Sequence, residues 1–370
     1  MSMGSDAFFV AGRRVVRRRS TFWAGVVIVG LVLPVLAASP VTVRTIRRAN
    51  HGLPLGPHRV LIAAPLHIAD RFTHKPLTFR AYYPSEPGRF PVIIFSHGLG
   101  GSRRAFSDLN TLLASYGYVV LAPDHPDAGI FYDLVSHGEL KGKLGLNESV
   151  IKQGLAATKK RLGGRSPVLA RLVQIKELLS ALPTIQQHLP QFRGRFNMHK
   201  IGMAGHSFGA FTTEMMSGVL VVPGRHFAGL PDSRIKAVEI ISGSGDKALV
   251  RVNRKAGAAG DLPMLVITGT RDNPPSGEGY RWREQPFSKS PPGKKFLLLM
   301  DGATHDSFQF NAAARRLDPN PPSPAAANAI ATEVERASLA FWDYIFKRSI
   351  KDGQYLKRGP WPTGVRIEHH

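Results

Sequence analysis

The chain has 370 residues, of which 43% are hydrophobic and 9% aromatic, and this is enough apolar material for one large core or two smaller ones. The composition excludes a disordered tail, a collagen-like fibre and a disulfide-stapled miniprotein, and the lack of cysteine excludes thiol nucleophiles, cysteine-ligated zinc and disulfides. The net charge is +23, of which residues 1–39 contribute +4, so the body carries +19 and favours anionic surfaces or substrates.

The first 39 residues follow the order of a secretory signal. Five arginines precede an apolar run at 22–36, and small residues follow the run. The segment 21–38 is at the lower limit for spanning a bilayer, so an uncleaved signal anchor stays open, and the pair Arg18-Arg19 also resembles a twin-arginine export signal. We expect 1–39 to be a signal peptide or a signal anchor, and the body to be exported to the periplasm or the exterior.

The body alternates short apolar runs with segments of helical length, which is the pattern of a mostly parallel sheet covered on both faces. Strands are predicted at 59–64, 77–83, 91–96, 118–122, 200–204, 235–241, 264–268 and 295–300. Helical periodicity marks 103–116, 168–189, 208–217 and 324–346. Gly/Pro-rich loops or a small lid are expected at 129–166, 218–234 and 273–293. The sequence therefore predicts one α/β domain over 50–370, with an eight-stranded sheet and loop insertions over its carboxyl edge.

A five-residue motif within this pattern points to catalysis. Residues 205–209 read Gly-His-Ser-Phe-Gly, which matches the G-x-S-x-G turn that presents a serine between a strand and a helix. The motif alone is weak, but a predicted strand ends at 204 and a predicted helix begins at 208. Ser207 is therefore the candidate nucleophile, at a helix N-terminus that favours an anion.

A serine nucleophile needs a base, and His305 is the candidate because its loop follows the last predicted strand at the same sheet edge. His206 and His97 also neighbour the site, and we expect them to pack or to hydrogen-bond loops instead. The imidazole needs an orienting carboxylate, and Asp272 follows the preceding predicted strand. Asp246 is the rival acid.

Two backbone donors are expected to stabilise the oxyanion. One is the N–H of Phe208, directly after the candidate nucleophile. The other is the N–H of Leu99, in the glycine-rich loop 96–101 after the third predicted strand. Walls of the substrate pocket are expected from Phe131, Tyr132, Tyr280 and Trp282.

Three segments together resemble the plasma-type platelet-activating-factor acetylhydrolases and the related bacterial dienelactone-hydrolase-like esterases. They are residues 95–100, the turn at 205–209 and the Gly302-x-x-His305 loop. The resemblance extends from about Pro91 to the C-terminal helix. It implies an α/β-hydrolase fold and hydrolysis of carboxylic esters, with Ser207, Asp272 and His305 as the triad and Leu99 and Phe208 as oxyanion donors.

One departure from the acetylhydrolase pattern bears on the acid. Those enzymes carry their acid after the sixth strand, where this chain has 241–244, Ile-Ser-Gly-Ser, without a carboxylate. The departure favours the bacterial esterase branch and places the acid at Asp272. True dienelactone hydrolases use a cysteine nucleophile, which this chain lacks.

These observations predict a serine esterase that forms an acyl-enzyme on Ser207 and needs no metal or organic cofactor. The expected substrate is a small-molecule or lipid-like ester. A lipase, a polyester hydrolase, a thioesterase and an amidase are the alternatives among enzymes, and a noncatalytic binding protein on the same scaffold is the alternative outside them. We expect no specific nucleic-acid partner, because no RNA motif or basic heptad helix accompanies the basic clusters, and we expect association with an anionic envelope surface.

Overall fold

The computed structural model describes residues 42–45, 52–137, 147–218, 230–245, 262–310, 318 and 320–370. The chain divides into two compact units, Met1–Leu33 and Pro34–His370. The expected signal segment lies outside the described residues. None of the described helices combines the length and the hydropathy that a membrane span requires.

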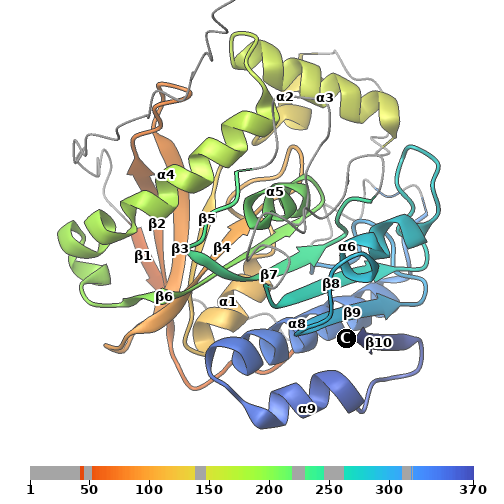
Figure 1. Cartoon of the computed structure of the whole chain (residues 1–370). Coiled ribbons are helices and arrows are strands. Elements are labelled where there is room, and N and C mark those ends of the chain that lie inside the picture. The colour runs from red at the N-terminus through yellow and green to blue at the C-terminus, as the bar shows by residue number, and fades with distance from the viewer. Residues whose placement is uncertain are drawn as a thin grey trace, which may run out of the picture. The chain divides into compact units, whose positions relative to one another are not determined.

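A single β-sheet forms the centre of the second unit (Figure 1). Its ten strands, counted over the described residues, are β1 (Thr42–Thr45), β2 (Val60–Ile68), β3 (Leu77–Pro84), β4 (Phe90–Ser96), β5 (Val119–Pro123), β6 (Phe196–His206), β7 (Ile235–Ile241), β8 (Met264–Gly269), β9 (Lys295–Met300) and β10 (Val365–His369). They lie in the order β1-β2-β3-β5-β4-β6-β7-β8-β9-β10. The six strands from β5 to β9 in this order pair in parallel, and β1, β2, β3 and β10 pair antiparallel.

The expected strand count of eight is wrong, because an edge strand was missed on each side of the sheet. β10 pairs with β9 and mixes charged with apolar residues, and none of its side chains is fully buried. β1 has only four residues, Thr-Val-Arg-Thr, and pairs with β2. A strand with a solvated face lacks the continuous apolar run that marks a strand buried on both faces.

Helices cover both faces of the sheet, as the sequence predicts. One face packs against α4 (Pro167–His188), α5 (Phe208–Ser217) and α6 (Gln285–Ser288). The other packs against α1 (Ser107–Ser115), α8 (Pro324–Phe346) and α9 (Ile350–Arg358). In Figure 1, α4 and α5 cross the sheet while α8 and α9 lie below it. This mixed α/β arrangement is that of an α/β-hydrolase fold.

The expected loop insertion at 129–166 contains two helices, α2 (Ile130–Ser136) and α3 (Glu148–Arg161). Most of α3 is exposed and polar, so the sequence carries little apolar periodicity there. Asn147 caps the N-terminus of α3, and its side chain accepts a hydrogen bond from the Val150 amide. Two short 3-10 turns, η1 (Pro190–Phe192) and η3 (Tyr280–Glu284), complete the described helices.

α8 packs against the sheet through apolar side chains and also forms buried hydrogen bonds with it. Glu239 of β7 is fully buried and accepts hydrogen bonds from Ser338 and, at 2.7 Å, from Trp342 Nε1. Burial raises the pKa of Glu239 to about 7. The hydrogen bonds from Ser338 and Trp342 act in the opposite direction but have a smaller effect. The Trp342 ring also fills the space beside Gly202, where a β-carbon would lie 2.4 Å from it.

The parallel strands bring distant segments of the chain to one edge of the sheet. β4, β6, β7, β8 and β9 all point the same way, so the segments after their last residues gather along the carboxyl edge. Those segments carry the loop after Ser96, then Ser207, Ser242, Asp272 and His305. Ligands of open α/β sheets bind at this edge.

Candidate active site

Ser207 lies on a sharp turn between β6 and α5. Its backbone has φ 56° and ψ −119°, a conformation that a residue with a side chain rarely adopts. The neighbouring glycines make the turn sterically possible. A β-carbon on Gly209 would lie 1.9 Å from the Ser96 carbonyl oxygen, and one on Gly205 would lie 2.3 Å from the Gly209 oxygen. The sequence motif therefore forms the turn that it predicts.

The structure brings the three expected triad residues into hydrogen-bond contact. His305 Nε2 lies 2.8 Å from Ser207 Oγ, and His305 Nδ1 lies 3.0 Å from Asp272 Oδ1. Because Nδ1 faces a carboxylate, it carries the ring proton, and Nε2 is then free to accept the serine proton. Both distances lie within the range that general-base catalysis requires.

Asp272 is fully buried and is held by several donors. Thr268 Oγ1 donates to Asp272 Oδ2 at 3.0 Å, and Arg283 Nε lies 2.7 Å from Oδ1. Burial acts to raise the pKa of Asp272, but the Arg283 charge and hydrogen bonds from His305 and Ser242 outweigh it, so the pKa lies below its ordinary value. The carboxylate is therefore ionised in the neutral pH range, ready to stabilise an imidazolium.

Arg283 and Ser242 are site residues that the sequence reasoning missed. Arg283 is 5% exposed and donates to the carbonyl oxygens of Asp272, Ser242 and Gly243 at 2.9, 3.1 and 2.8 Å. Ser242 Oγ lies 2.7 Å from His305 Nδ1. The signal for Ser242 was its place directly after β7. No local pattern marks Arg283, which lies in a segment expected to be a loop.

The structure describes the two histidines that also neighbour the site, but not the rival acid. Asp246 lies outside the described residues. His206 Nε2 donates to the backbone oxygen of His305 at 2.8 Å, and burial and the nearby His305 lower the pKa of His206 to about 3, so His206 is neutral. His97 is buried, and its Nδ1 lies 2.7 Å from the Gly98 oxygen. Both histidines thus contact backbone rather than Ser207.

The expected oxyanion donors lie beside Ser207, the candidate nucleophile. Leu99 and Phe208 both line the cavity that contains Ser207 and His305. A β-carbon on Gly98, the neighbour of Leu99, would lie 3.3 Å from Ser207 Cβ, so this loop runs close to the nucleophile. Within the described residues, neither the Leu99 nor the Phe208 amide has a hydrogen-bond acceptor. Both donors remain available to a substrate oxygen.

The cavity has a volume of about 820 Å³. Its apolar walls come from α2, α3, α4, α5, η3 and two loops. They are Leu99, Ala105, Phe131, Ile151, Leu155, Val168, Phe208, Phe211, Pro274, Pro275 and Trp282. Its main polar side chains are Arg104, Asn273, Arg283, Asp306 and Gln309. A mostly apolar wall with a few polar groups is typical of sites that bind organic ligands.

Two of the four expected pocket residues line this cavity, and two do not. Phe131 and Trp282 are in its wall. Tyr132 is 78% exposed, because it follows Phe131 on α2 and successive helical residues point about 100° apart. Tyr280, in η3, is half-buried and lies outside the lining. Among the described residues, no group of His, Asp and Glu side chains has the arrangement of a metal site.

Comparison with known proteins matches a segment of the chain that contains Ser207. Residues 76–218 match the family model of platelet-activating factor acetylhydrolase, isoform II. This range contains Leu99, Ser207 and Phe208. The match supports the platelet-activating-factor acetylhydrolase-like esterase family. Asp272 and His305 lie beyond the matched residues, so their assignment depends on their places after the strands and on the geometry.

Individual relatives agree with the family match. A putative phospholipase A2 of Schizosaccharomyces pombe is 30% identical over 161 residues, which cover 37% of this chain and 37% of the relative. Platelet-activating factor acetylhydrolases of Cavia porcellus and Bos taurus are 31% and 29% identical, and each alignment covers 34% of this chain and 31% of the relative. The chain thus spans about a third of the length of the curated relatives it matches.

Proposed function

We propose that the chain is a serine hydrolase that cleaves carboxylic esters through an acyl-enzyme on Ser207. The observation that carries the proposal is the 2.8 Å separation between His305 Nε2 and Ser207 Oγ, with Asp272 on the other ring nitrogen. A serine hydroxyl is a poor nucleophile until a base removes its proton, and this arrangement supplies the base and its orienting carboxylate.

The proposed reaction has two halves. In the first, His305 takes the Ser207 proton as Oγ attacks the ester carbonyl, and the Leu99 and Phe208 amides stabilise the oxyanion. His305 then gives the proton to the leaving alcohol. In the second, His305 activates a water molecule that attacks the acyl-enzyme, and the collapse of the second tetrahedral intermediate releases the acid and returns the proton to Ser207.

We propose a lipid-like ester as the substrate. The wall formed by Phe131, Ile151, Leu155, Val168 and Phe211 offers an apolar surface to an acyl chain beside Ser207. The matched relatives are named for lipid esters, which is consistent with this choice. A lipase, a polyester hydrolase, a thioesterase and an amidase would use the same machinery, and a panel of acyl chains and leaving groups separates them.

The cellular setting is also a proposal. We infer from residues 1–39 that the chain is exported, with the segment removed or kept as an anchor, and that 50–370 form the catalytic domain. The charge of +19 on the body fits an anionic envelope surface or an anionic ester. Placement in the dienelactone-hydrolase-like branch stays a prediction that the comparisons do not test.

Hydrolysis of a short-chain p-nitrophenyl ester tests the proposed function. Wild-type protein should release nitrophenol, and Ser207→Ala should reduce the rate to the background rate while the circular dichroism spectrum stays the same. Ser288→Ala, which changes an exposed serine at the end of α6, should keep the wild-type rate. A wild-type protein that turns over no ester in the panel would contradict the proposal and favour the noncatalytic binding protein.

A further inference from the structure

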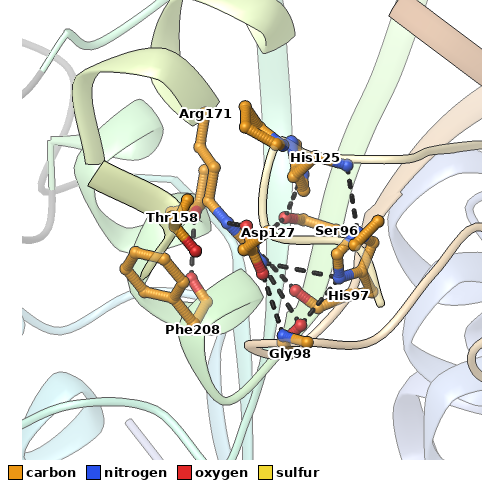
Figure 2. Close-up of polar contacts among 12 residues, drawn as sticks. Ser96, His97, Gly98, His125, Asp127, Thr158, Arg171 and Phe208 are labelled. Atoms are coloured by element: carbon orange, nitrogen blue, oxygen red, sulfur yellow. Dashed lines mark hydrogen bonds and ion pairs between the residues drawn. The ribbon is translucent and has the colours of Figure 1, made fainter. Parts of the chain in front are cut away.

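A buried ion pair lies behind the loop that carries Leu99. Arg171 of α4 and Asp127 are 0% and 1% exposed, and they pair through two parallel contacts, Nε to Oδ1 at 2.8 Å and Nη2 to Oδ2 at 2.6 Å (Figure 2). Removing two charges from water is costly, and the cost is offset only when further hydrogen bonds satisfy both groups. The remaining partners of this pair are therefore informative.

The other hydrogen bonds of the two side chains go to residues 96–100, at the end of β4 and in the loop that carries Leu99. Arg171 Nη1 donates to the His97 oxygen at 2.7 Å, and Nη2 donates to the Gly98 oxygen at 3.2 Å. Asp127 Oδ2 accepts the Gly100 amide at 2.9 Å. The guanidinium thus binds carbonyls on one side of Leu99, and the carboxylate binds the amide on the other side. Figure 2 shows Arg171 and Asp127 facing His97 and Gly98.

The contact with Gly98 bears directly on Leu99. The Gly98 carbonyl and the Leu99 N–H belong to one planar trans peptide, so they point in opposite directions. Fixing the carbonyl toward Arg171 therefore fixes the direction of the Leu99 N–H. Neutral His97 supports the same orientation, because its Nε2 accepts the His125 amide and its Nδ1 consequently donates to the Gly98 oxygen at 2.7 Å.

Arg171 also contacts the residue that carries the second donor. Its guanidinium carbon lies 4.3 Å from the centre of the Phe208 ring, within the range of a cation–π contact. Phe208 is the first residue of α5, directly after Ser207. The Arg171 side chain thus donates hydrogen bonds to the loop of Leu99 and makes a cation–π contact with the Phe208 ring.

We propose that Arg171, held by Asp127, is a positioning residue that sets the oxyanion hole by fixing the Leu99 peptide relative to Phe208. The inference rests on the proposed serine esterase function. Arg171 is fully buried and is not among the residues that line the cavity, so we expect it to act without touching the substrate. Its contribution is expected in the transition state, where charge develops on the carbonyl oxygen, and not in binding of the neutral ester.

Arg171→Lys and Asp127→Asn test this role. Lysine keeps the charge but cannot bind the carboxylate and two carbonyls at once, and asparagine keeps the shape of Asp127 but weakens the pair. Loss of one oxyanion donor lowers kcat by about 10²–10³-fold in serine proteases, so we expect kcat to fall by about 10–10³-fold with KM within about threefold. Affinity for a trifluoromethyl ketone, which binds as a tetrahedral oxyanion, should fall in parallel, while affinity for a nonhydrolysable ether analogue should stay unchanged.

Arg234→Lys is the matched control. Arg234 also pairs with an aspartate, Asp232, through Nε to Oδ1 at 2.8 Å and Nη2 to Oδ2 at 2.6 Å, but it lies directly before β7, at the end of the sheet opposite the carboxyl edge. It should keep the wild-type kcat. Asp127→Asn alone decides the question if Arg171→Lys does not fold. Variants that lose thermal stability yet keep kcat and ketone affinity would overturn the inference, whereas a wild-type protein without esterase activity would overturn the proposed function instead.

Discussion

Ser242 Oγ lies 2.7 Å from His305 Nδ1, closer than the 3.0 Å between that nitrogen and Asp272 Oδ1. The imidazole therefore has two oxygen partners on the side away from Ser207. A hydrogen bond from Ser242 is among the causes that lower the pKa of Asp272. The Ser242 hydroxyl is thus placed to accept a hydrogen bond from His305 Nδ1 and to donate one to the Asp272 carboxylate. Ser242 thus links His305 to Asp272 without carrying charge itself.

Substitutions of Asp272 and Ser242 should lower kcat by different amounts. Asp272→Asn leaves the imidazole facing an amide and favours the wrong tautomer, so kcat should fall by about 10⁴-fold. Ser242→Ala removes one neutral hydrogen bond and leaves the carboxylate in place, so the loss should be about tenfold or less. Steady-state hydrolysis of a p-nitrophenyl ester measures both. Asp246→Asn should have little effect, and the reverse ranking of Asp246 and Asp272 would make Asp246 the acid.

Acyl-chain preference should depend on α3. Leu155 lines the apolar wall of the cavity, so Leu155→Trp should shorten the space for an acyl chain. We expect kcat/KM for a decanoate ester to fall by about tenfold or more relative to acetate, because one methylene displaced from an apolar pocket is worth about 1–3 kcal/mol. Lys152→Trp, which adds the same side chain at an exposed position on α3, is the control. Equal loss on acetate and decanoate would place the acyl chain elsewhere.

The melting temperature should decrease as the pH rises, and Glu239 should account for part of the decrease. Its pKa is raised from 4.5 to about 7 in the folded protein, so the folded state binds more protons than the unfolded state between these values. The contribution of Glu239 to stability is therefore full below about pH 4.5 and is lost as the pH rises through about 7. Glu239→Gln resembles the protonated carboxyl and can keep both hydrogen bonds. The fall in Tm between about pH 5 and pH 8 should be smaller in this variant, and parallel Tm curves would contradict the assignment.

The sequence was most informative where local chemistry and chain order agree. A glycine-flanked serine between a buried strand and a helix has few structural solutions, so Ser207 and its turn followed from five residues. Asp272 and His305 followed from the rule that parallel strands end at one edge. The central strands were predicted because buried parallel strands are continuous apolar runs.

The residues that the sequence did not reveal act through tertiary contacts. Arg171 and Arg283 reach the site from helical segments, and nothing local separates a buried arginine from a solvated one in a chain with so many. Ser242 acquires its role from a neighbour 63 positions away. The prediction for Tyr132 is wrong for a similar reason. The sequence indicates that its segment lies at the site, but which side chains point into the cavity depends on the rotation of α2 about its axis.

The most direct test of the account is to find which atom reacts with a serine-directed electrophile. Wild-type protein would be treated with a fluorophosphonate, digested and mapped by mass spectrometry, beside Ser207→Ala and His305→Ala. The account predicts a single phosphonylated site at Ser207 in the wild type, none in Ser207→Ala and strongly slowed labelling in His305→Ala. Labelling at another residue, or equal rates with and without the His305 imidazole, would contradict it.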